Sequence, residues 1–387
     1  MFHWFNWDTA DWQPMRLADN TRAFSRIGVE PTLEFAEYGR SLSQIDGPIP
    51  IPHPVEGGRA YISLGEPIYL RVNPGPSPDT GVPVEPADDN PADVNFPTRF
   101  DKFEFAVGAD GILFSNTTAV DFVGIPLQYT LRQEGRAPIG PVGVALPPGA
   151  SADPLAWLLQ DLAADPIFSR LINPQRTFAP KLASDHAGPD FGPGSTLLDP
   201  YIDLCWQRYA ETEAVLRNFI DIPASEHLDV ARDEVGISVC WTARGEVIDG
   251  VFTFRVIELR TPDDTLLTPP ERPLTILRPS THDVFRQGGV FDKITDGPTY
   301  LREIDGDIKN QVSTALNRRV MHGEYRGPVD PGASVPNPRH PEAMWADVSS
   351  FYAPNGLDEA VFHTNTYARV LHCLLYTSPS PRDGTKS

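Results

Sequence analysis

A β-hairpin between residues 103 and 118 is the feature that most constrains the fold of this chain. Apolar residues alternate with others in the run Phe103–Val107, which is typical of a strand with one buried face. The sequence GADG at Gly108–Gly111 predicts a turn, and Ile112–Thr118 is the predicted returning strand. The 41 prolines and 30 glycines indicate many further turns and argue against a helical bundle. The sequence therefore predicts a mainly β fold for this part of the chain.

Two carboxylates accompany the hairpin, Glu104 on its first strand and Asp121 just beyond its second strand. A four-residue turn would place Glu104 opposite Ser115, with Asp121 six positions farther along. In a straight ladder, at about 3.3 Å per residue, the two carboxylates would then lie roughly 20 Å apart. Any chemistry that they share therefore requires a bend or bulge between Ser115 and Asp121, and we predict such a bend.

Helical periodicity begins after residue 148 and predicts three helices. Asp153 and Pro154 are typical of the cap and the first position of the earliest helix. The apolar stripes of the three helices are, in order, Leu155, Leu158, Leu159 and Leu162; Ile202, Cys205, Trp206, Tyr209, Leu216 and Phe219; and Ile308, Val312, Ala315, Leu316 and Val320. Strands are predicted at Val235–Trp241 and Val251–Leu259, with two shorter extended runs within Arg59–Val72.

The order of these elements predicts a mainly β fold with an α+β part. We expect a β domain over residues 1–150, to which residues 344–372 return, and a mixed α/β domain over residues 151–343. Residues 373–387 are expected to lie outside the fold, because Cys373–Asp383 back-translates codon for codon into a transposon adapter used for sequencing libraries. On this interpretation the genuine chain stops near His372, before its natural end. The alternative is a disordered tail rich in serine and proline.

The composition argues against several kinds of partner. A formal net charge of −20 disfavours a nucleic acid, which requires a basic surface, and also disfavours anionic membrane surfaces. No stretch of eighteen apolar residues is present, so we expect no membrane span. The first thirteen residues have neither the basic nor the apolar region of a signal peptide. The histidines show no metal-ligand spacing, and Cys205 and Cys240, the cysteines before the tail, allow at most one disulfide.

Several blocks of the sequence occur in the order found in one enzyme family. The segment Phe100–Leu127 closely resembles the catalytic segment of the glycoside hydrolase family 64 β-1,3-glucanases. Other blocks that resemble the family lie in the same order around it: GRAYISLG (Gly58–Gly65), DPYIDLCW (Asp199–Trp206), RPSTHDVF (Arg278–Phe285), TALNRRV (Thr314–Val320) and TNTYARVLH (Thr364–His372). Each block alone is a weak signal, but together and in order they form a specific one.

This resemblance implies a thaumatin-like β-barrel or sandwich with an inserted mixed α/β domain and a wide groove between them. It also implies inverting, endo-type hydrolysis of linear β-1,3-glucan, such as laminarin or curdlan, to short oligosaccharides. An uncharged glucan is compatible with the acidic composition of the chain. Members of the family are typically secreted, and we expect a monomer that uses no metal or other cofactor.

The resemblance also implies roles for five residues. By motif position, Glu104 matches the general acid and Asp121 matches the general base. Asp93 falls on a groove carboxylate, Phe114 replaces an aromatic groove residue, and Thr118 matches a hydroxyl three residues before the base, so these three are implied to bind substrate. Inverting hydrolysis requires one protonated carboxyl and one ionised carboxylate, about 6.5–9.5 Å apart so that a water molecule fits between them.

The sequence departs from the family pattern at two positions of the catalytic segment. Ala106 and Gly108 stand where the family usually has a threonine and an asparagine, so two polar groove contacts are missing. The chain also stops before an aromatic strand and paired aspartates with which the family ends. These departures leave open a non-catalytic, thaumatin-like protein that binds β-glucan. A surface protein that uses the same groove for another purpose is a third interpretation.

Overall fold

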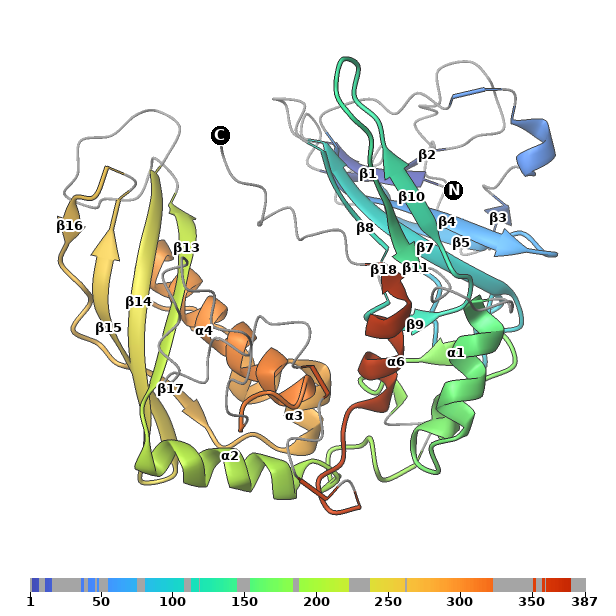
Figure 1. Ribbon diagram of the computed structural model, residues 1–387. Helices are drawn as coiled ribbons and strands as arrows, with labels where there is room; N and C mark the ends of the chain where they lie inside the picture. The colour runs from blue at the N-terminus through green and yellow to red at the C-terminus, as the bar shows by residue number, and fades with distance from the viewer. Residues whose placement is uncertain are drawn as a thin grey trace. The chain divides into compact units, whose positions relative to one another are not determined.

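The computed structural model describes residues 2–6, 11–15, 36–37, 41–45, 47–48, 55–74, 81–107, 113–117, 119–144, 154–183, 188–222, 237–261, 263–322, 351–352, 357–358 and 360–376. The chain divides into two compact units (Figure 1). The first comprises residues 1–186 and 370–387, and the second comprises residues 187–369. Each unit is described by itself below.

An antiparallel five-stranded sheet forms the centre of the first unit. Its strands, in spatial order, are β2 (Asp11–Met15), β1 (Phe2–Asn6), β4 (Val55–Leu64), β7 (Arg99–Val107) and β8 (Leu113–Asn116). Strand β7 therefore has a hydrogen-bonded neighbour on each side, β4 and β8, as Figure 1 shows. Side chains on β7 are held at fixed positions within this sheet, which makes the strand a rigid support for a functional site.

Smaller sheets complete the first unit. One contains β3 (Ala36–Glu37), β5 (Tyr69–Pro74) and β6 (Gly81–Val84), and another contains β10 (Gln128–Leu131), β11 (Ile139–Val144) and β18 (Leu375–Tyr376). The pair β9 (Phe122–Val123) and β12 (Thr177–Phe178) joins two segments far apart in sequence. The helical elements are η1 (Leu42–Gln44), α1 (Pro154–Ala163), η2 (Phe168–Leu171) and the end of α6 (Thr366–Leu374).

One buried cluster in the core of the first unit is largely aromatic and draws its residues from several of these sheets. It consists of Tyr61, Ile68, Leu70, Phe100, Phe122 and Phe178, with Phe96 packed against it. The rings of Phe100 and Phe122 meet edge to face with centroids 5.3 Å apart, a favourable aromatic geometry. Gly124, the residue after β9, lies against the backbone of Phe100. A Cβ atom at this position would be 2.1 Å from the carbonyl oxygen of Phe100, so only glycine fits.

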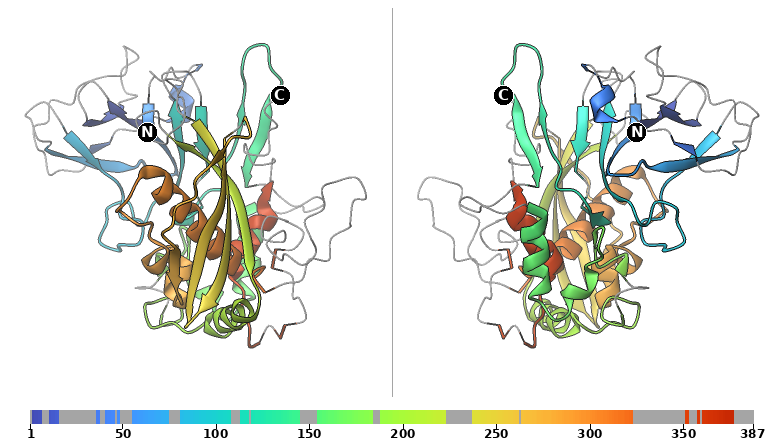
Figure 2. Two further views of the ribbon diagram at one scale, coloured as in Figure 1. Left: turned by 90° about the vertical axis from the view of Figure 1, so that its left-hand side faces the viewer. Right: turned by 90° about the vertical axis from the view of Figure 1, so that its right-hand side faces the viewer.

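The second unit is a twisted antiparallel sheet covered by helices. Its strands are β13 (Ala214–Ile222), β14 (Ile237–Ile248), β15 (Val251–Arg260) and β16 (Leu266–Leu267), with β17 (Leu274–Leu277) also paired to β15. The helices are α2 (Asp199–Glu211), α3 (Thr281–Arg286), η4 (Gly289–Phe291) and α4 (Thr299–Asn317). In the two views of Figure 2, α4 lies along one face of the sheet. Trp206 and Tyr209 of α2 pack on Phe252 of β15.

The predicted helices are confirmed, with one correction. Helix α1 buries Leu158 and Leu162, as its stripe predicted, and α2 contains Ile202 to Tyr209 of its stripe. Helix α4 contains Ile308 to Leu316 of the third stripe but begins earlier, at Thr299, and ends before Val320. Leu216 and Phe219, however, lie on strand β13 and not on α2, which ends at Glu211. The helical spacing of these two residues was misleading, because Leu216 follows the period-two burial of a strand and Phe219 is exposed. The predicted strands at Val235–Trp241 and Val251–Leu259 correspond to β14 and β15.

The predicted mixture of sheet and helix is confirmed, since the chain is a sheet-rich α/β protein. The first unit extends to residue 186, beyond the predicted boundary at 150, because β12 pairs with β9. The chain returns to the first unit at Val370, and β18 then pairs with β11. Residues 373–376 therefore belong to α6 and β18 and lie within the fold, although the sequence predicted that residues 373–387 lie outside it. Cys205 and Cys240 are free thiols. No helix in the described part of the chain has the length and hydrophobicity required to cross a membrane.

Candidate active site

One face of strand β7 passes from the core of the first unit to its surface. Residues 100, 102, 104 and 106 share this face because side chains alternate along a strand. Phe100 is fully buried, Lys102 is buried, and Glu104 keeps 32% of its side chain exposed. On the neighbouring strand β8, Asn116 lies opposite Glu104 and Phe114 lies opposite Ala106. The strand therefore carries a charged residue at the boundary between the core and the solvent.

The hairpin register differs by one residue from the sequence prediction. Val107 pairs with Leu113, so Glu104 lies opposite Asn116 and not opposite Ser115. The connection is one residue longer than the predicted turn, and that turn lies in residues 108–112, which are outside the described residues. The predicted bend is observed, because β8 ends at Asn116 and the chain then pairs with β12 through β9 instead of continuing along β7. Asp121 is thereby brought back toward β7.

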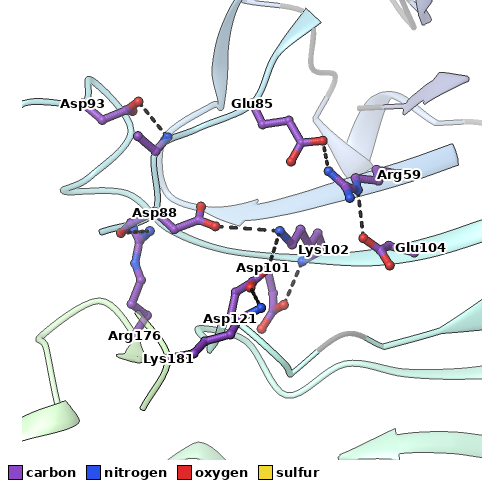
Figure 3. Close-up of polar contacts among 11 residues, drawn as sticks. Arg59, Glu85, Asp88, Asp93, Asp101, Lys102, Glu104, Asp121, Arg176 and Lys181 are labelled. Atoms are coloured by element: carbon purple, nitrogen blue, oxygen red, sulfur yellow. Dashed lines mark hydrogen bonds and ion pairs between the residues drawn. The ribbon is translucent and has the colours of Figure 1, made fainter. Parts of the chain in front are cut away.

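The carboxylate of Glu104 is held by a residue of the neighbouring strand. Arg59 lies directly opposite Glu104 on β4, and its Nε atom donates to Oε1 of Glu104 over 2.8 Å. The same guanidinium group also contacts the carboxylate of Glu85, which follows β6 (Figure 3). Arg59 therefore bridges two carboxylates, and all three side chains are about one third exposed. An arginine fork is suited to this bridging role because its donors have a fixed geometry.

Asp121 is held between two lysines. Its backbone oxygen accepts from the N–H group of Ala179 over 2.8 Å, next to the β9–β12 pair. Lys181 approaches Oδ1 at 2.5 Å, and Lys102 approaches Oδ2 at 3.1 Å. Burial alone would raise the pKa of Asp121, but the hydrogen bond from Lys181 and the charge of Lys102 outweigh it, so its pKa is lowered. This carboxylate is consequently ionised at neutral pH.

Lys102 connects Asp121 to a second, more deeply buried carboxylate. Its Nζ atom lies 3.7 Å from Oδ2 of Asp88, and the exposed fractions of the two side chains are only 5% and 12%. Burial raises the pKa of Asp88 to about 6, although Lys102 and Arg176 oppose this shift. Figure 3 shows Lys102 in contact with both Asp88 and Asp121, while Glu104 lies farther along the same strand.

Arg176 fixes the loop that carries Asp88. Its guanidinium group donates to four backbone oxygens of this loop, those of Asp88, Asn95, Phe96 and Thr98. The same group lies over the rings of Phe100 at 4.4 Å and Phe122 at 5.3 Å. The loop between β6 and β7 is therefore fastened to the aromatic core, which keeps Asp88 beside Lys102.

Asp101, the residue between Phe100 and Lys102, has a structural function. Its carboxylate accepts from the backbone N–H groups of Lys102, Gly124 and Ile125 at 2.8–3.0 Å. Burial raises the pKa of Asp101 to about 6, and these three hydrogen bonds oppose the shift. Asp101 joins β7 to the segment after β9 and so helps to place Asp121 next to Lys102.

The five predicted site residues have different outcomes. Glu104 and Phe114 lie on paired strands, with Phe114 67% exposed, and Asp121 is linked to the same face through Lys102. Asp93 accepts from the N–H groups of Ala87 and Asn95, so its carboxylate shapes its own loop. Thr118 lies outside the described residues. Within the residues that are described, no group of three or more His, Cys, Asp or Glu side chains is placed to hold a metal ion.

Several charged residues around this site were missed from the sequence. They are Arg59, Glu85, Asp88, Lys102, Arg176 and Lys181. Lys102 could have been predicted, because it precedes Glu104 by two residues and its side chain therefore lies on the same face of the strand. The contacts of Asp88, Arg176 and Lys181 join segments up to 88 residues apart, so no local pattern indicates them.

Comparisons with known proteins relate the whole arrangement to one family. A family model described as β-1,3-glucanase, glycoside hydrolase family 64, matches residues 36–376. The fold is similar to that of a β-1,3-glucanase domain from Clostridium beijerinckii, with a TM-score of 0.61, 22% identity, and coverage of 96% of this chain and 82% of that one. A laminaripentaose-producing β-1,3-glucanase in complex with laminaritetraose has a TM-score of 0.53 and 20% identity, with coverage of 84% and 70%.

The comparison with curated proteins gave no significant match. The family model nevertheless spans most of the chain, including the segment Phe100–Leu127 with its two carboxylates. The two solved structures agree with it in fold. The chain therefore belongs to glycoside hydrolase family 64, the β-1,3-glucanases.

Proposed function

We propose that the protein is an inverting, endo-acting glycoside hydrolase that cleaves linear β-1,3-glucan into short oligosaccharides. Glu104 acts as the general acid and Asp121 as the general base. The observation that carries this proposal is the arrangement around β7, where Glu104 lies on an open face and an ionised Asp121 is linked to that face through Lys102. Membership of the β-1,3-glucanase family supports the choice of substrate.

The two carboxyl groups perform complementary steps. Glu104 donates a proton to the glycosidic oxygen, so that the bond from this oxygen to the anomeric carbon breaks and the alcohol leaves. Asp121 accepts a proton from a water molecule whose oxygen bonds to the same carbon from the opposite face. Arg59 contacts both Glu104 and Glu85, so Glu85 remains as its partner when Glu104 carries the proton. Lys181 and Lys102 keep Asp121 ionised until the water attacks.

Three further residues complete the proposed substrate site. Phe114 offers an exposed ring next to the face of Glu104, suitable for stacking against a glucose unit. Asp93 contributes through the shape of its loop, which its hydrogen bonds to Ala87 and Asn95 maintain. Thr118 is proposed as a hydroxyl contact on the basis of its motif position.

The proposal extends to the domain architecture, the location and the oligomeric state of the protein. We infer that the first unit is the thaumatin-like β domain predicted over residues 1–150 and 344–372, and that the second unit is the inserted mixed α/β domain predicted over residues 151–343. The family typically acts outside the cell, so a secreted monomer is the expected form. Thermal unfolding of separately expressed units, together with sedimentation of the whole chain, tests this part of the proposal.

A digest of laminarin, with products separated by length, tests the activity. The parent protein should release short gluco-oligomers, and Glu104→Gln should release none, because glutamine has no proton to donate to the leaving oxygen. Glu134→Gln, an exposed position in the β10–β11 connection, is the matched control and should behave as the parent. A folded parent that releases no products would contradict the proposal.

A glucan-binding protein without hydrolase activity is the second candidate. Ala106 favours it, because this residue faces Phe114 on the open side of the hairpin and supplies no polar group there. In that case Glu104→Gln and the parent would bind curdlan equally, and neither would release products. An enzyme would bind curdlan in both forms but release products only as the parent.

A further inference from the structure

Lys102 lies between two carboxylates at the buried end of the site. Its Nζ atom is 3.1 Å from Oδ2 of Asp121 and 3.7 Å from Oδ2 of Asp88, and it lies 5.8 Å from the ring centroid of Phe122. Lys181 contacts the other oxygen of Asp121. Charges therefore alternate along the row Asp88, Lys102, Asp121 and Lys181, which Figure 3 shows.

A cation that is shared in this way acts differently on Asp121 according to the charge of Asp88. Charges interact strongly over 3–4 Å in a poorly solvated site, because the effective dielectric constant is far below that of water. When Asp88 is ionised, it offsets part of the attraction between Lys102 and Asp121. When Asp88 is protonated, Lys102 acts on Asp121 alone and makes this carboxylate a weaker proton acceptor.

Asp88 is held in place whatever its charge. Arg176 donates to the backbone oxygen of Asp88 over 3.3 Å and to three more oxygens of the same loop. The guanidinium group itself lies over the rings of Phe100 and Phe122. The loop is therefore anchored by contacts that do not involve the carboxyl group of Asp88, so a change of its charge leaves its position beside Lys102 intact.

We propose that Asp88 is a positioning residue that controls the general base Asp121 through Lys102. This inference rests on the proposed function, in which Asp121 accepts a proton from the attacking water. Asp88 takes no part in the making or breaking of bonds and exchanges its own proton with solvent. Its ionised form strengthens Asp121 as a proton acceptor and so accelerates the base-assisted step.

The groups that face Asp88 define the pH range of this control. Lys102 approaches from β7, Arg176 from the segment before β12, and Asp121 and Asp89 add negative charge. Burial dominates and raises the pKa of Asp88 to about 6, whereas the pKa of Asp121 is lowered. Asp88 therefore changes its charge near pH 6 while Asp121 remains ionised. The acidic limb of kcat should consequently lie near pH 6 and follow Asp88.

Asp101 is the other carboxyl group near Lys102 whose pKa is raised to about 6. It differs from Asp88 because three backbone N–H groups bind its two oxygens, which commits it to holding the strand in place. Its replacement should lower stability, whereas replacement of Asp88 should alter the pH profile. The two residues are thus separable by experiment.

The test compares Asp88→Asn with Asp89→Asn, a matched change at the next residue, in the full chain. Laminarin hydrolysis is measured from pH 4.5 to pH 8 with kcat and KM resolved, and melting temperatures are recorded beside it. Asp88→Asn should lower kcat about threefold to tenfold at neutral pH, leave KM within about twofold and lose the acidic limb near pH 6. Asp89→Asn should keep kcat at neutral pH and retain the limb, shifted only slightly to lower pH because Asp89 is the weakest of the charges that act on Asp88, and Asp88→Glu should restore both kcat and the limb in part.

Two results would overturn the inference. One is an Asp88→Asn variant that keeps the limb near pH 6 with an unchanged kcat. The other is a loss of kcat that is accompanied by a clearly lower melting temperature and is not recovered by Asp88→Glu, since a structural role alone would explain it. Removal of a buried negative charge should not lower the melting temperature at pH 8, because burial disfavours the ionised form.

A second readout separates this inference from the proposed function. Carboxyl carbon NMR of protein labelled at aspartate, with Asp121 assigned from Asp121→Asn, follows the Asp121 signal directly. In the parent it should shift near pH 6 as Asp88 titrates, and this shift should be absent in Asp88→Asn. A shift without laminarin hydrolysis would reject the proposed function while retaining the coupling. Hydrolysis without any shift would reject the coupling alone.

Discussion

Buried charges occur in both units of the molecule, but they are arranged differently. In the second unit, Lys309 and Asp305 of α4 form an ion pair of 3.0 Å with exposed fractions of 7% and 2%. Lys309 also donates to the backbone oxygen of Asp292, and Asp305 accepts from the N–H group of Ile294. This pair is enclosed by backbone partners and serves the fold.

The row of charges in the first unit opens to solvent at one end. Lys102 is as buried as Lys309, but its partner Asp121 keeps 25% of its side chain exposed. In this row Lys102 contacts the carboxylates of Asp88 and Asp121 and not backbone oxygens. The charge of Lys102 therefore acts on groups that can exchange protons with substrate and solvent. A buried ion pair of which one member remains accessible to solvent is therefore a candidate for function, whereas a fully enclosed pair is a candidate for structure.

The strongest test of this difference is replacement of the accessible member. Asp121→Asn should lower kcat at least about a hundredfold, because the amide cannot accept a proton from the attacking water. The melting temperature at neutral pH should also fall, because Asp121 is an ion-pair partner of the buried Lys102 and its ionised form stabilises the fold, but a loss of stability alone leaves the kcat of the folded protein intact. Initial rates on laminarin and a thermal melt measure the two quantities. A variant that keeps more than a tenth of the parental kcat would show that Asp121 is not the base.

Breaking the enclosed pair of Lys309 and Asp305 should instead affect mainly the stability of the protein. Lys309→Met should lower the free energy of unfolding by about 3–5 kcal/mol, because Asp305 would be left charged and buried without its partner. Urea denaturation measures the change, and the matched double variant Asp305→Leu with Lys309→Met should recover much of it. Equal losses in the single and double variants would argue against an unpaired charge as the cause.

The dependence of stability on pH should also reflect the buried carboxyls of the first unit. The folded-state pKa of Asp88 and of Asp101 is about 6, above the ordinary value of 3.8, so the folded form retains these protons more strongly. Their contribution is therefore fully present below about pH 4 and is lost as the pH rises through about 6, by up to about 3 kcal/mol each. Urea titrations at pH 5 and pH 7 test this sign, and Asp88→Asn should reduce the difference.

Asp121 contributes with the opposite sign. Its folded-state pKa is lowered, so its contribution is present above the ordinary value and is lost as the pH falls through the lowered one. This loss lies at a more acidic pH than the change caused by Asp88 and Asp101. A stability curve that rose steadily between pH 4 and pH 7 would contradict the assignment of these raised pKa values.

The smallest expected effect is at the open edge of the hairpin. Phe114→Ala should raise KM for laminarin by about threefold to tenfold and leave kcat nearly unchanged, because stacking holds the substrate equally in the ground and transition states. Leu113→Ala, the preceding and less exposed residue of β8, is the control. A fall in kcat without a change in KM would place Phe114 closer to the chemistry than proposed.

The sequence was most informative where structure is local. The stripe of Leu155, Leu158 and Leu162 predicts α1 because helical packing needs only one amphipathic segment. The same reasoning failed at Leu216 and Phe219, whose spacing of three residues fits a helix but places them on opposite faces of strand β13. The hairpin register was wrong by one residue, because turn length alone decides it and the turn chemistry allows more than one length.

The candidate site could be predicted only in part. Glu104 and Asp121 were found by their resemblance to a family motif, and alternation alone would have added Lys102. Asp88, Arg176 and Lys181 join the site through tertiary contacts that no period in the sequence encodes. The charge of Asp88 depends on its burial, which is a property of the folded loop.

The stereochemistry of the first product tests the central claim most directly. Proton NMR during early laminarin hydrolysis distinguishes the two anomers of the new reducing end before they interconvert. Direct attack of water activated by Asp121 inverts the anomeric carbon, so the α-anomer should appear first. Initial release of the β-anomer, or no release from the folded protein, would contradict the roles assigned to Glu104 and Asp121.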